Sequence, residues 1–329
     1  MKKRSHPLIQ MLLLTIALYG LVTACLMLIQ AVVGEHWTPI AFLNTFAQLL
    51  WLPALILLPL ALILRAGRTA LLLVPVAMAW VITFGDHFVP KAPLSPTSDQ
   101  TTFTFATFNL YDFPRDTSSI VSIIRAMNAD VVAVQELNIS MSVALERELG
   151  EIYSYRAMHR DEGRYRGMGV LSKYPMTDDY YWHYTWMPTD LGHQRVQLEI
   201  AGQTLTLFNL HPVHPGVIGN GFDPSWRSRE IAALLEETRA YQPVMMAGDF
   251  NMPELSEDYA RITHGAGFED AYRTRGWGLG HTFTHHVAPF LRLDYIFLGD
   301  GLDAIEARVW DKSGGSDHLP VLATLVLNP

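Results

Sequence analysis

The sequence predicts two parts of different class: an all-α bundle of three apolar helices, then an α/β domain of packed sheets flanked by helices. Hydrophobic residues make up 50% of the 329 residues and concentrate before residue 90, where charged residues are few. Short β-rich runs separated by loops follow residue 100, and strands outnumber helices without strict alternation, which favours packed sheets. The expected divisions are a membrane anchor at 1–89, a linker at 90–100 and a catalytic-type domain at 101–329.

Three apolar runs, 8–33, 39–64 and 69–84, each have roughly the 20 residues that cross a bilayer core. The first follows a basic start, but it is longer than the roughly 7–15 residues of a signal-peptide core. Three such runs are hard to bury in any other way, so they predict three transmembrane helices. Proline is expected to kink the second and third of these helices, at Pro53, Pro59 and Pro75.

Basic residues predict the orientation of these helices. Positive charge lies in Lys2-Lys3-Arg4 and at Arg65 and Arg68, whereas the turn at 34–37 has none. Because cytoplasmic loops carry an excess of Lys and Arg, the amino terminus and the second turn are expected on the cytoplasmic side. In a bacterium, this predicts a multi-pass protein of the inner (cytoplasmic) membrane whose 101–329 domain is periplasmic (extracytoplasmic). The Pro-rich linker would hold that domain close to the bilayer.

The part of the chain after residue 89 is acidic. Of the 24 Lys and Arg and the 32 Asp and Glu, five and two precede residue 90, which leaves a balance of −11. A domain that bound a polyphosphate backbone mainly through charge is expected to be basic. The composition therefore argues against simple electrostatic nucleic-acid binding.

The elements expected after residue 100 follow from local periodicity. Strands are predicted at 103–108, 131–134, 196–200, 205–210, 244–247, 293–298 and 319–327. Helices are predicted at 118–127, 140–149 and 227–241. Six of these strands have polar residues at or beside one end: Asn109, Gln135-Glu136, Asn209 with His211, Asp249 with Asn251, Asp294, and Ser316-Asp317-His318. This arrangement predicts a functional site along one rim of a sheet.

Six motifs carry this pattern, namely Phe108-Asn109-Leu110, Gln135-Glu136, Asn209-Leu210-His211, Gly248-Asp249-Phe250-Asn251, Arg292-Leu293-Asp294-Tyr295 and Ser316-Asp317-His318-Leu319-Pro320. Their order resembles that of the endonuclease/exonuclease/phosphatase (DNase-like) superfamily over roughly residues 101–329. The resemblance implies a four-layer α-β-β-α sandwich with two facing sheets. It also implies a phosphoric ester hydrolase that depends on Mg²⁺, with Mn²⁺ as a possible substitute.

The metal ligands are expected among residues with oxygen ligands, because Mg²⁺ prefers one or two carboxylates together with waters. Glu136 is the first choice, both by residue type and by the resemblance. Asn109 and Asp317 would complete or flank the site. Histidines suggest zinc as an alternative, from His211, His214, His281, His285 and His286, although their spacing matches no usual structural zinc site.

The resemblance also implies catalytic roles for the other rim residues. Asp249 would orient or deprotonate the attacking water, and Asn251 would hold a phosphate oxygen. Asp294 would fix the tautomer of His318, which acts as a base or steadies the phosphate. His211 would donate to a non-bridging oxygen as charge develops.

Three arginines are candidates for substrate binding. Arg164 and Arg166 match a stretch that lies beside the substrate groove in the superfamily, and either could clamp a phosphate. Arg227 resembles a basic residue of the helix after the His211 loop. Ordinary solvated positions for the first two, and a helix-surface ion pair for Arg227, are the competing interpretations.

The substrate is less constrained than the chemistry. An aromatic run in a probable loop at 180–188 and a Gly/Pro-rich loop at 213–226 suggest a site that faces the lipid bilayer, because Trp and Tyr favour the interface. The aromatics could instead pack under the sheet or stack on nucleobases. We therefore expect hydrolysis of a lipid head group, of the phospholipase C or sphingomyelinase kind, in preference to an extracytoplasmic nuclease acting on DNA or RNA. An inactive membrane-tethered binding module is the third alternative, and no protein partner is indicated.

Overall fold

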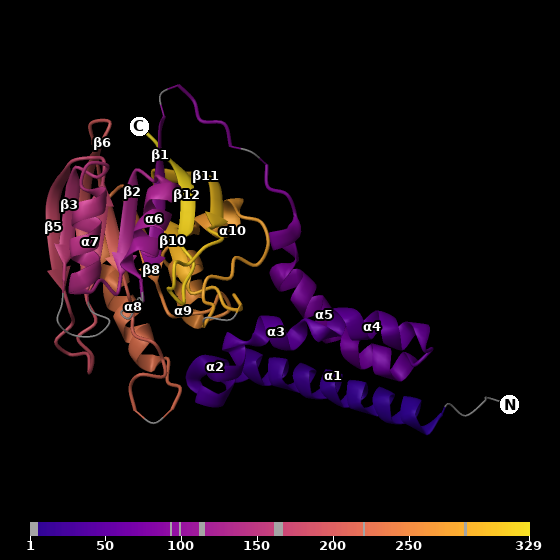
Figure 1. Ribbon diagram of the computed structural model, residues 1–329. Coiled ribbons are helices and arrows are strands. Elements are labelled where there is room, and N and C mark those ends of the chain that lie inside the picture. Colours follow the sequence, from indigo (N-terminus) through magenta and orange to yellow (C-terminus); the bar gives the residue numbers. More distant parts are fainter. Residues whose placement is uncertain are drawn as a thin grey trace. The chain divides into compact units, whose positions relative to one another are not determined.

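The computed structural model describes residues 6–92, 94–98, 100–111, 116–160, 167–219, 221–285 and 288–329. The chain forms two compact units (Figure 1). One comprises Met1–Val89 and Leu255–Glu257, and the other comprises Pro90–Glu254 and Asp258–Pro329. Arg164 and Arg166 lie outside the described residues.

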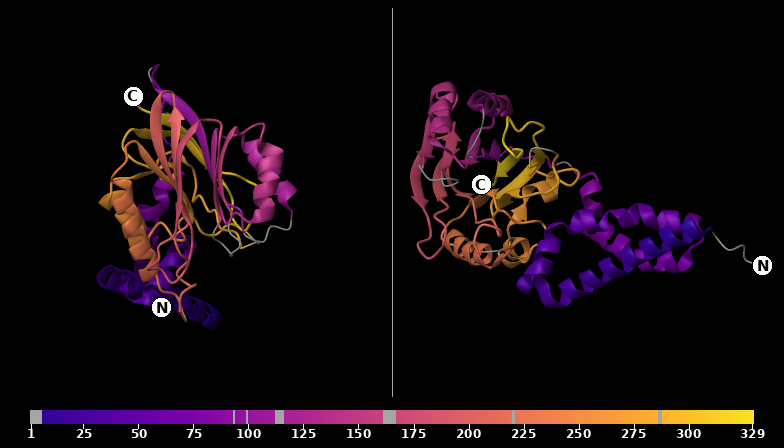
Figure 2. Two further views of the ribbon diagram at one scale, coloured as in Figure 1. Left: turned by 90° about the vertical axis from the view of Figure 1, so that its left-hand side faces the viewer. Right: turned by 60° about the horizontal axis from the view of Figure 1, so that its bottom comes forward.

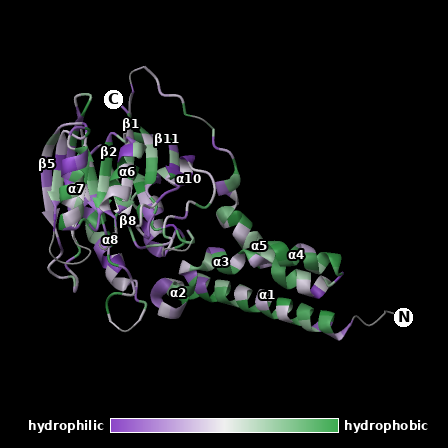
Figure 3. Cartoon of the chain, viewed as in Figure 1, coloured by the Kyte–Doolittle hydropathy of each residue, from purple (hydrophilic) through white to green (hydrophobic). Residues whose placement is uncertain are grey.

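The first unit is helical, and its apolar runs are longer than the strands of globular proteins. Its elements are α1 (Pro7–Val33), the short turn η1 (Gly34–His36), α2 (Thr38–Thr45), α3 (Ala47–Trp51), α4 (Pro53–Ile63), α5 (Gly67–Phe84) and η2 (Gly85–Phe88). Many of its large apolar side chains are exposed, including Leu14, Val32 and Ile63. Apolar residues cover these helices on most sides (Figure 3), as expected for helices that face lipid.

Two stretches of helix, Pro7–His36 and Gly67–Phe88, are long and apolar enough to cross a membrane. The predicted run at 39–64 is not one straight helix: α2 and the following Ala47–Ile63 differ in direction by 72°. The break falls at Phe46, whose backbone is non-helical (φ −106°, ψ 11°), and not at a proline. Pro53 begins α4, where a missing N–H costs nothing, while Pro59 and Pro75 lie inside α4 and α5.

The second unit contains two six-stranded sheets. The order of the first is β11 (Leu302–Val309), β12 (Val321–Leu327), β1 (Thr101–Asn109), β2 (Val131–Gln135), β4 (Met168–Ser172) and β3 (Tyr155–His159). The order of the second is β5 (Met176–Trp182), β6 (His193–Ile200), β7 (Gln203–Leu210), β8 (Val244–Asp249), β10 (Asp294–Leu298) and β9 (Glu269–Asp270). Both sheets are mixed, since β1 and β2 are parallel, as are β7 and β8, while their other pairs are antiparallel.

Helices cover the outer faces of both sheets, so the unit has four layers. The first sheet packs against α6 (Thr117–Met127) and α7 (Ile139–Leu149), and the second against α8 (Ser225–Thr238). The view in the left panel of Figure 2 shows the sheets between these helices. Short elements α9 (Glu257–Ala260), η3 (Arg261–Gly265) and α10 (Ala271–Arg275) complete the second half. The apolar face between the sheets, with Phe105 and Leu207, forms the largest core.

Local sequence explains most of these elements. In α6, buried Ile120 and Ile124 share one face, Asp116 caps the amino end by accepting from the Ser118 N–H, and Asn128 ends the helix in the left-handed conformation. The strands and helices predicted from periodicity are all present, within a few residues at each end. Strands β3, β4, β5, β9 and β11 were not predicted.

The aromatic run was placed in a loop, and the structure corrects this. Residues up to Trp182 belong to β5. Trp182 is buried and packs against Phe208, while the Tyr184 hydroxyl donates to Glu237 (2.6 Å). Tyr180 and Trp186 remain exposed. The start of the run therefore belongs to the edge of the second sheet. The sequence did not indicate this strand, because Asp178-Asp179 and Tyr180-Tyr181-Trp182 lack the polar/apolar alternation of a half-buried strand.

Candidate active site

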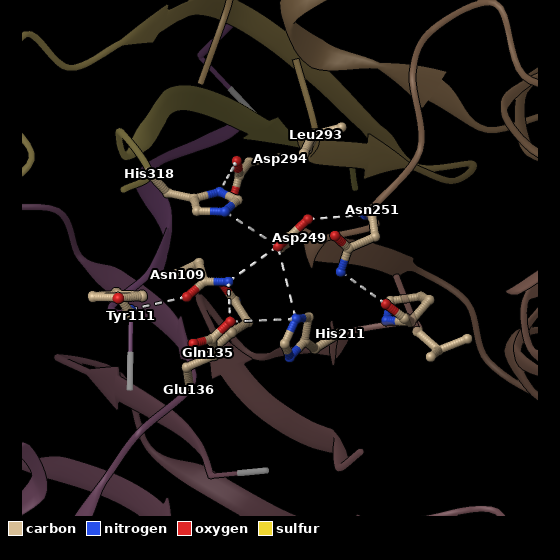
Figure 4. Close-up of polar contacts among 12 residues, drawn as sticks. Asn109, Tyr111, Gln135, Glu136, His211, Asp249, Asn251, Leu293, Asp294 and His318 are labelled. Carbon is tan, nitrogen blue, oxygen red and sulfur yellow. Dashed lines mark hydrogen bonds and ion pairs between the residues drawn. The ribbon is translucent and has the colours of Figure 1, made fainter. Parts of the chain in front are cut away.

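Strand register brings the rim residues together. Asn109 ends β1 opposite Gln135, so Glu136 follows directly beside it. Asp249, the last residue of β8, lies opposite Asp294, the first residue of β10. His211 follows β7, whose Leu210 is paired with Gly248. Figure 4 shows that the resulting side chains point toward one another from both sheets.

Left-handed backbone at two rim positions directs side chains into the site. Glu136 has φ 56° and Asn251 has φ 49°. Such a conformation costs a non-glycine residue on the order of 1–2 kcal/mol, and residues that store this strain cluster at functional sites. Gly248, with φ 142°, allows close approach, because a side-chain carbon there would lie 1.9 Å from the Leu210 carbonyl oxygen.

Asn109 connects the two sheets at the centre of the site. Its Nδ2 donates to Glu136 Oε1 (3.0 Å) and to Asp249 Oδ2 (3.0 Å). His211 Nε2 lies 3.7 Å from each of the same two oxygens. Two carboxylates thus share one amide and one imidazole in a largely buried position. This cluster concentrates negative charge and suits a divalent cation.

His318 and Asp294 form a buried pair beside this cluster. His318 Nδ1 lies 2.8 Å from Asp294 Oδ2, and Nε2 lies 3.5 Å from Asp249 Oδ2. Burial lowers the pKa of His318, but the charges of Asp294 and Asp249 and the Asp294 hydrogen bond outweigh it and raise this pKa to about 10. The ring is therefore protonated at neutral pH in the metal-free protein.

Asn251 holds the Asp249 turn and the His211 loop together. Its backbone N–H donates to Asp249 Oδ1 (2.9 Å), and its side-chain Nδ2 donates to the carbonyl oxygen of Pro212 (3.0 Å). Each oxygen of Asp249 therefore accepts one N–H, one from Asn251 and one from Asn109. These bonds fix the orientation of the carboxylate.

One compact group of possible ligand atoms does not include the proposed metal ligands Glu136, Asn109 and Asp317. Among the described residues, Asp249, Asp294 and His318 each offer one atom, and these atoms lie within 4.8 Å of one another. The charge of Asp317 contributes to the raised pKa of His318, and its main-chain carbonyl accepts from Thr284. Asn109 and Glu136 lie on the other side of Asp249 (Figure 4).

Arg227 lies inside the protein, only 1% exposed. Its Nε pairs with Asp258 Oδ2 (2.9 Å), and its Nη1 donates to the carbonyl oxygen of Asn251 (2.6 Å). These bonds join α8 to the turn that carries Asp249 and Asn251. The structure therefore shows Arg227 supporting the site from behind.

Sequence patterns gave no signal for several residues next to the site. The Phe283 ring lies 5.1 Å from that of His318. Arg292, close to Asp294 in sequence, is buried against Asp270 (2.6 Å) and lies over the Tyr295 ring. Only the conformation of the chain brings Phe283 to the rim, and the motif that contains Arg292 did not indicate that its side chain is buried against Asp270.

Known proteins share this fold. An endonuclease/exonuclease/phosphatase from Bacteroides vulgatus is 21% identical with a TM-score of 0.60, over 69% of this chain and 100% of that chain. One from Beutenbergia cavernae is 20% identical with a TM-score of 0.59, over 69% and 72%. D. rerio TDP2 complexed with single strand DNA product is 18% identical with a TM-score of 0.56, over 68% and 99%. No curated protein matches the chain significantly.

At these identities the solved structures establish the fold alone, and the sequence itself gives the family. The model of the Endonuclease/Exonuclease/phosphatase family matches residues 106–318, which is more than half of the chain and includes the rim residues from Asn109 to His318. The chain therefore belongs to the endonuclease/exonuclease/phosphatase family, whose members generally hydrolyse phosphate esters.

Proposed function

We propose that the protein is a membrane-anchored, Mg²⁺-dependent phosphodiesterase that acts on a lipid head group. The observation that carries this proposal is the gathering of Glu136, Asp249, Asp294 and His318, from both sheets, around Asn109 and His211. A phosphodiester resists attack because its own charge repels nucleophiles and its leaving alkoxide is poor. A divalent cation held by the buried carboxylates, with N–H donors beside it, would offset both obstacles.

The donor set fits a hard divalent cation. Three buried carboxylates lie together, and Asp294 Oδ1 is buried without a hydrogen-bond partner among the described residues. Glu136 and Asn109 would hold the metal, with Asp317 flanking it. When bound, Mg²⁺ supplies charge that offsets the phosphate and stabilises the leaving oxygen.

The residues around that position have separate roles. Asp249, held by two N–H donors, orients the attacking water and accepts its proton. The charges of Asp294 and Asp249 raise the pKa of His318 in the metal-free protein, which favours a role for His318 in steadying negative charge on the phosphate. His211 and Asn251 are the donors for non-bridging oxygens.

The membrane proposal rests on the amino-terminal helices and on charge. Two of these helices are long and apolar enough to span a membrane. The basic residues Arg65 and Arg68 would lie on the cytoplasmic side. This arrangement puts the catalytic unit in the periplasm if the bent segment Thr38–Ile63 completes a third crossing.

The acidic balance of −11 after residue 89 and exposed Trp186 and Val217 favour a lipid substrate over a polyanion. A nuclease is the second candidate, because the D. rerio TDP2 structure of the same fold is complexed with a single strand DNA product.

The test uses the full-length chain in detergent micelles. Mixed micelles containing phosphatidylcholine or sphingomyelin are compared with single-stranded and double-stranded DNA, each with Mg²⁺ and with EDTA. We expect Mg²⁺-dependent release of the head group and slow cleavage of DNA. Rapid DNA cleavage with inert lipid would establish the nuclease instead, and activity unchanged by EDTA would overturn the metal requirement.

A further inference from the structure

A second histidine–carboxylate pair is buried behind His211. His193 is the first residue of β6, and Glu230 lies on α8; both are at most 1% exposed. His193 Nε2 lies 2.9 Å from Glu230 Oε1. Neither residue belongs to a motif of the rim, and neither touches the carboxylate cluster.

The hydrogen bonds of the pair determine where its proton lies. His193 Nδ1 accepts from the backbone N–H of His211 (3.4 Å), so this nitrogen carries no proton. The proton is then on Nε2, which donates to Glu230 Oε1. The other carboxylate oxygen, Oε2, accepts the backbone N–H of Val213 (2.7 Å). The pair therefore binds one backbone N–H on each side of Pro212.

The same three-residue segment is held from the front as well. Asn251 donates to the carbonyl oxygen of Pro212, as described above. Residues 211–213 are thus fixed by three hydrogen bonds from β6, α8 and the turn after β8. Because the His211 ring lies 3.7 Å from both Glu136 and Asp249, a small shift of this segment changes those distances directly.

Packing leaves the pair little freedom. The His193 ring lies 5.5 Å from that of Trp182 and 5.7 Å from that of Tyr184. A buried carboxylate is costly unless its oxygens are satisfied, and both oxygens of Glu230 are. An apolar pair of the same size would fill the same space but leave the buried N–H groups of His211 and Val213 without acceptors, so these two side chains do more than fill the core.

We propose that His193 and Glu230 are positioning residues that hold the His211 ring at its place beside the carboxylates of Glu136 and Asp249. The proposal rests on the function proposed above, since it assigns His211 to that reaction. The aromatic run of β5 then has a role: it packs the ring that supports the catalytic loop.

The decisive variant is Glu230→Gln. An amide has one accepting end and one donating end, so it cannot accept from both His193 and Val213. With bis(4-nitrophenyl) phosphate and Mg²⁺, kcat should fall roughly 10- to 100-fold, the size expected from misplacing a catalytic group by about 1 Å. Amide hydrogen exchange at His211 and Val213 should become faster.

Glu237→Gln is the matched control. Glu237 lies two turns further along α8 and accepts from Tyr184 without touching residues 211–213. This variant should leave kcat and the exchange at residues 211–213 unchanged.

The proposal requires that the effect of Glu230→Gln on kcat depend on the presence of the His211 side chain. In a His211→Ala background, Glu230→Gln should change kcat less than about twofold, because the group that it positions is gone. An equal fall in both backgrounds would overturn the positioning role, as would unchanged exchange at Val213. A wild-type chain without phosphodiesterase activity would overturn the proposed function instead, while the exchange comparison still tests the positioning.

A second variant covers the case in which Glu230→Gln does not fold. Replacing both partners, His193→Phe together with Glu230→Met, removes the buried charge and keeps the volume. This double variant should fold and show the same loss of kcat and the same faster exchange. Full activity in the folded double variant would contradict the proposal.

Discussion

The two buried histidine–carboxylate pairs have nearly the same geometry but different surroundings. His318 and Asp294 are 2.8 Å apart, and His193 and Glu230 are 2.9 Å apart. The second ring nitrogen of His318, Nε2, faces the Asp249 carboxylate. The second ring nitrogen of His193, Nδ1, accepts a backbone N–H. The group that faces the second ring nitrogen therefore decides whether such a pair acts on the carboxylate cluster or fixes backbone.

Removing the imidazole of the His318–Asp294 pair, called the front pair below, should have the largest effect. We expect His318→Ala to lower kcat by roughly 10³-fold, because a positioned proton donor or acceptor contributes about 10²–10⁴-fold. Turnover of bis(4-nitrophenyl) phosphate with Mg²⁺ measures the loss, and circular dichroism checks the fold. Normal turnover in a folded His318→Ala chain would remove the front pair from the reaction.

Changing only the carboxylate of the front pair should cost less. Asp294→Asn keeps the shape but removes the charge that holds the His318 ring protonated. We expect a loss of roughly 10²-fold in kcat, together with a lower pKa of His318. The ring proton resonances of His318, followed by NMR as a function of pH, would show the change. An unchanged His318 pKa would mean that Asp249 alone sets it.

The pair Arg227–Asp258 sharpens the comparison, because it is buried but contains no imidazole. Arg227→Ala leaves Asp258 with fewer partners and should destabilise the protein by about 3 kcal/mol. We expect KM for the substrate to change little. Urea denaturation in detergent, followed by tryptophan fluorescence, measures the first effect. A large rise in KM with unchanged stability would support the substrate-binding role that the sequence suggested for Arg227.

The smallest effect concerns pH. The folded pKa of His318, about 10, lies above its ordinary value of 6.5. Protonation therefore stabilises the metal-free fold fully below about pH 6.5, and this contribution is lost as the pH rises through about 10. The urea midpoint in EDTA should fall between pH 7 and pH 10 more steeply in the wild type than in His318→Gln. Parallel curves would exclude the charge of His318 as a source of stability.

Sequence patterns were sufficient to predict that the rim residues lie close together, because each of them stands at or just beyond the end of a strand. Asn109 and Asp249 follow apolar runs, and strands of fixed register bring such ends together. The resemblance to the superfamily then implied the four-layer fold. Periodicity also located α6 and α8 within a few residues.

The remaining features could not be predicted from the sequence, because they depend on contacts between elements that are distant along the chain. His193 and Glu230 are 37 residues apart, in a strand and a helix whose patterns are satisfied without them. Arg227 was a candidate for substrate binding, with a helix-surface ion pair as the alternative, and its burial was missed because helix periodicity does not reveal which neighbours a helix meets. The break at Phe46 has no proline or glycine to announce it.

The left-handed backbone of Glu136 and Asn251 has a consequence for engineering. Glycine adopts such angles without strain, so Glu136→Gly would relieve on the order of 1 kcal/mol of backbone strain while removing a functional group. Asn251→Gly would relieve similar strain but lose the hydrogen bond to the carbonyl oxygen of Pro212, which contributes about 1 kcal/mol. Selection for heat resistance alone would therefore oppose catalysis at Glu136 and be nearly neutral at Asn251.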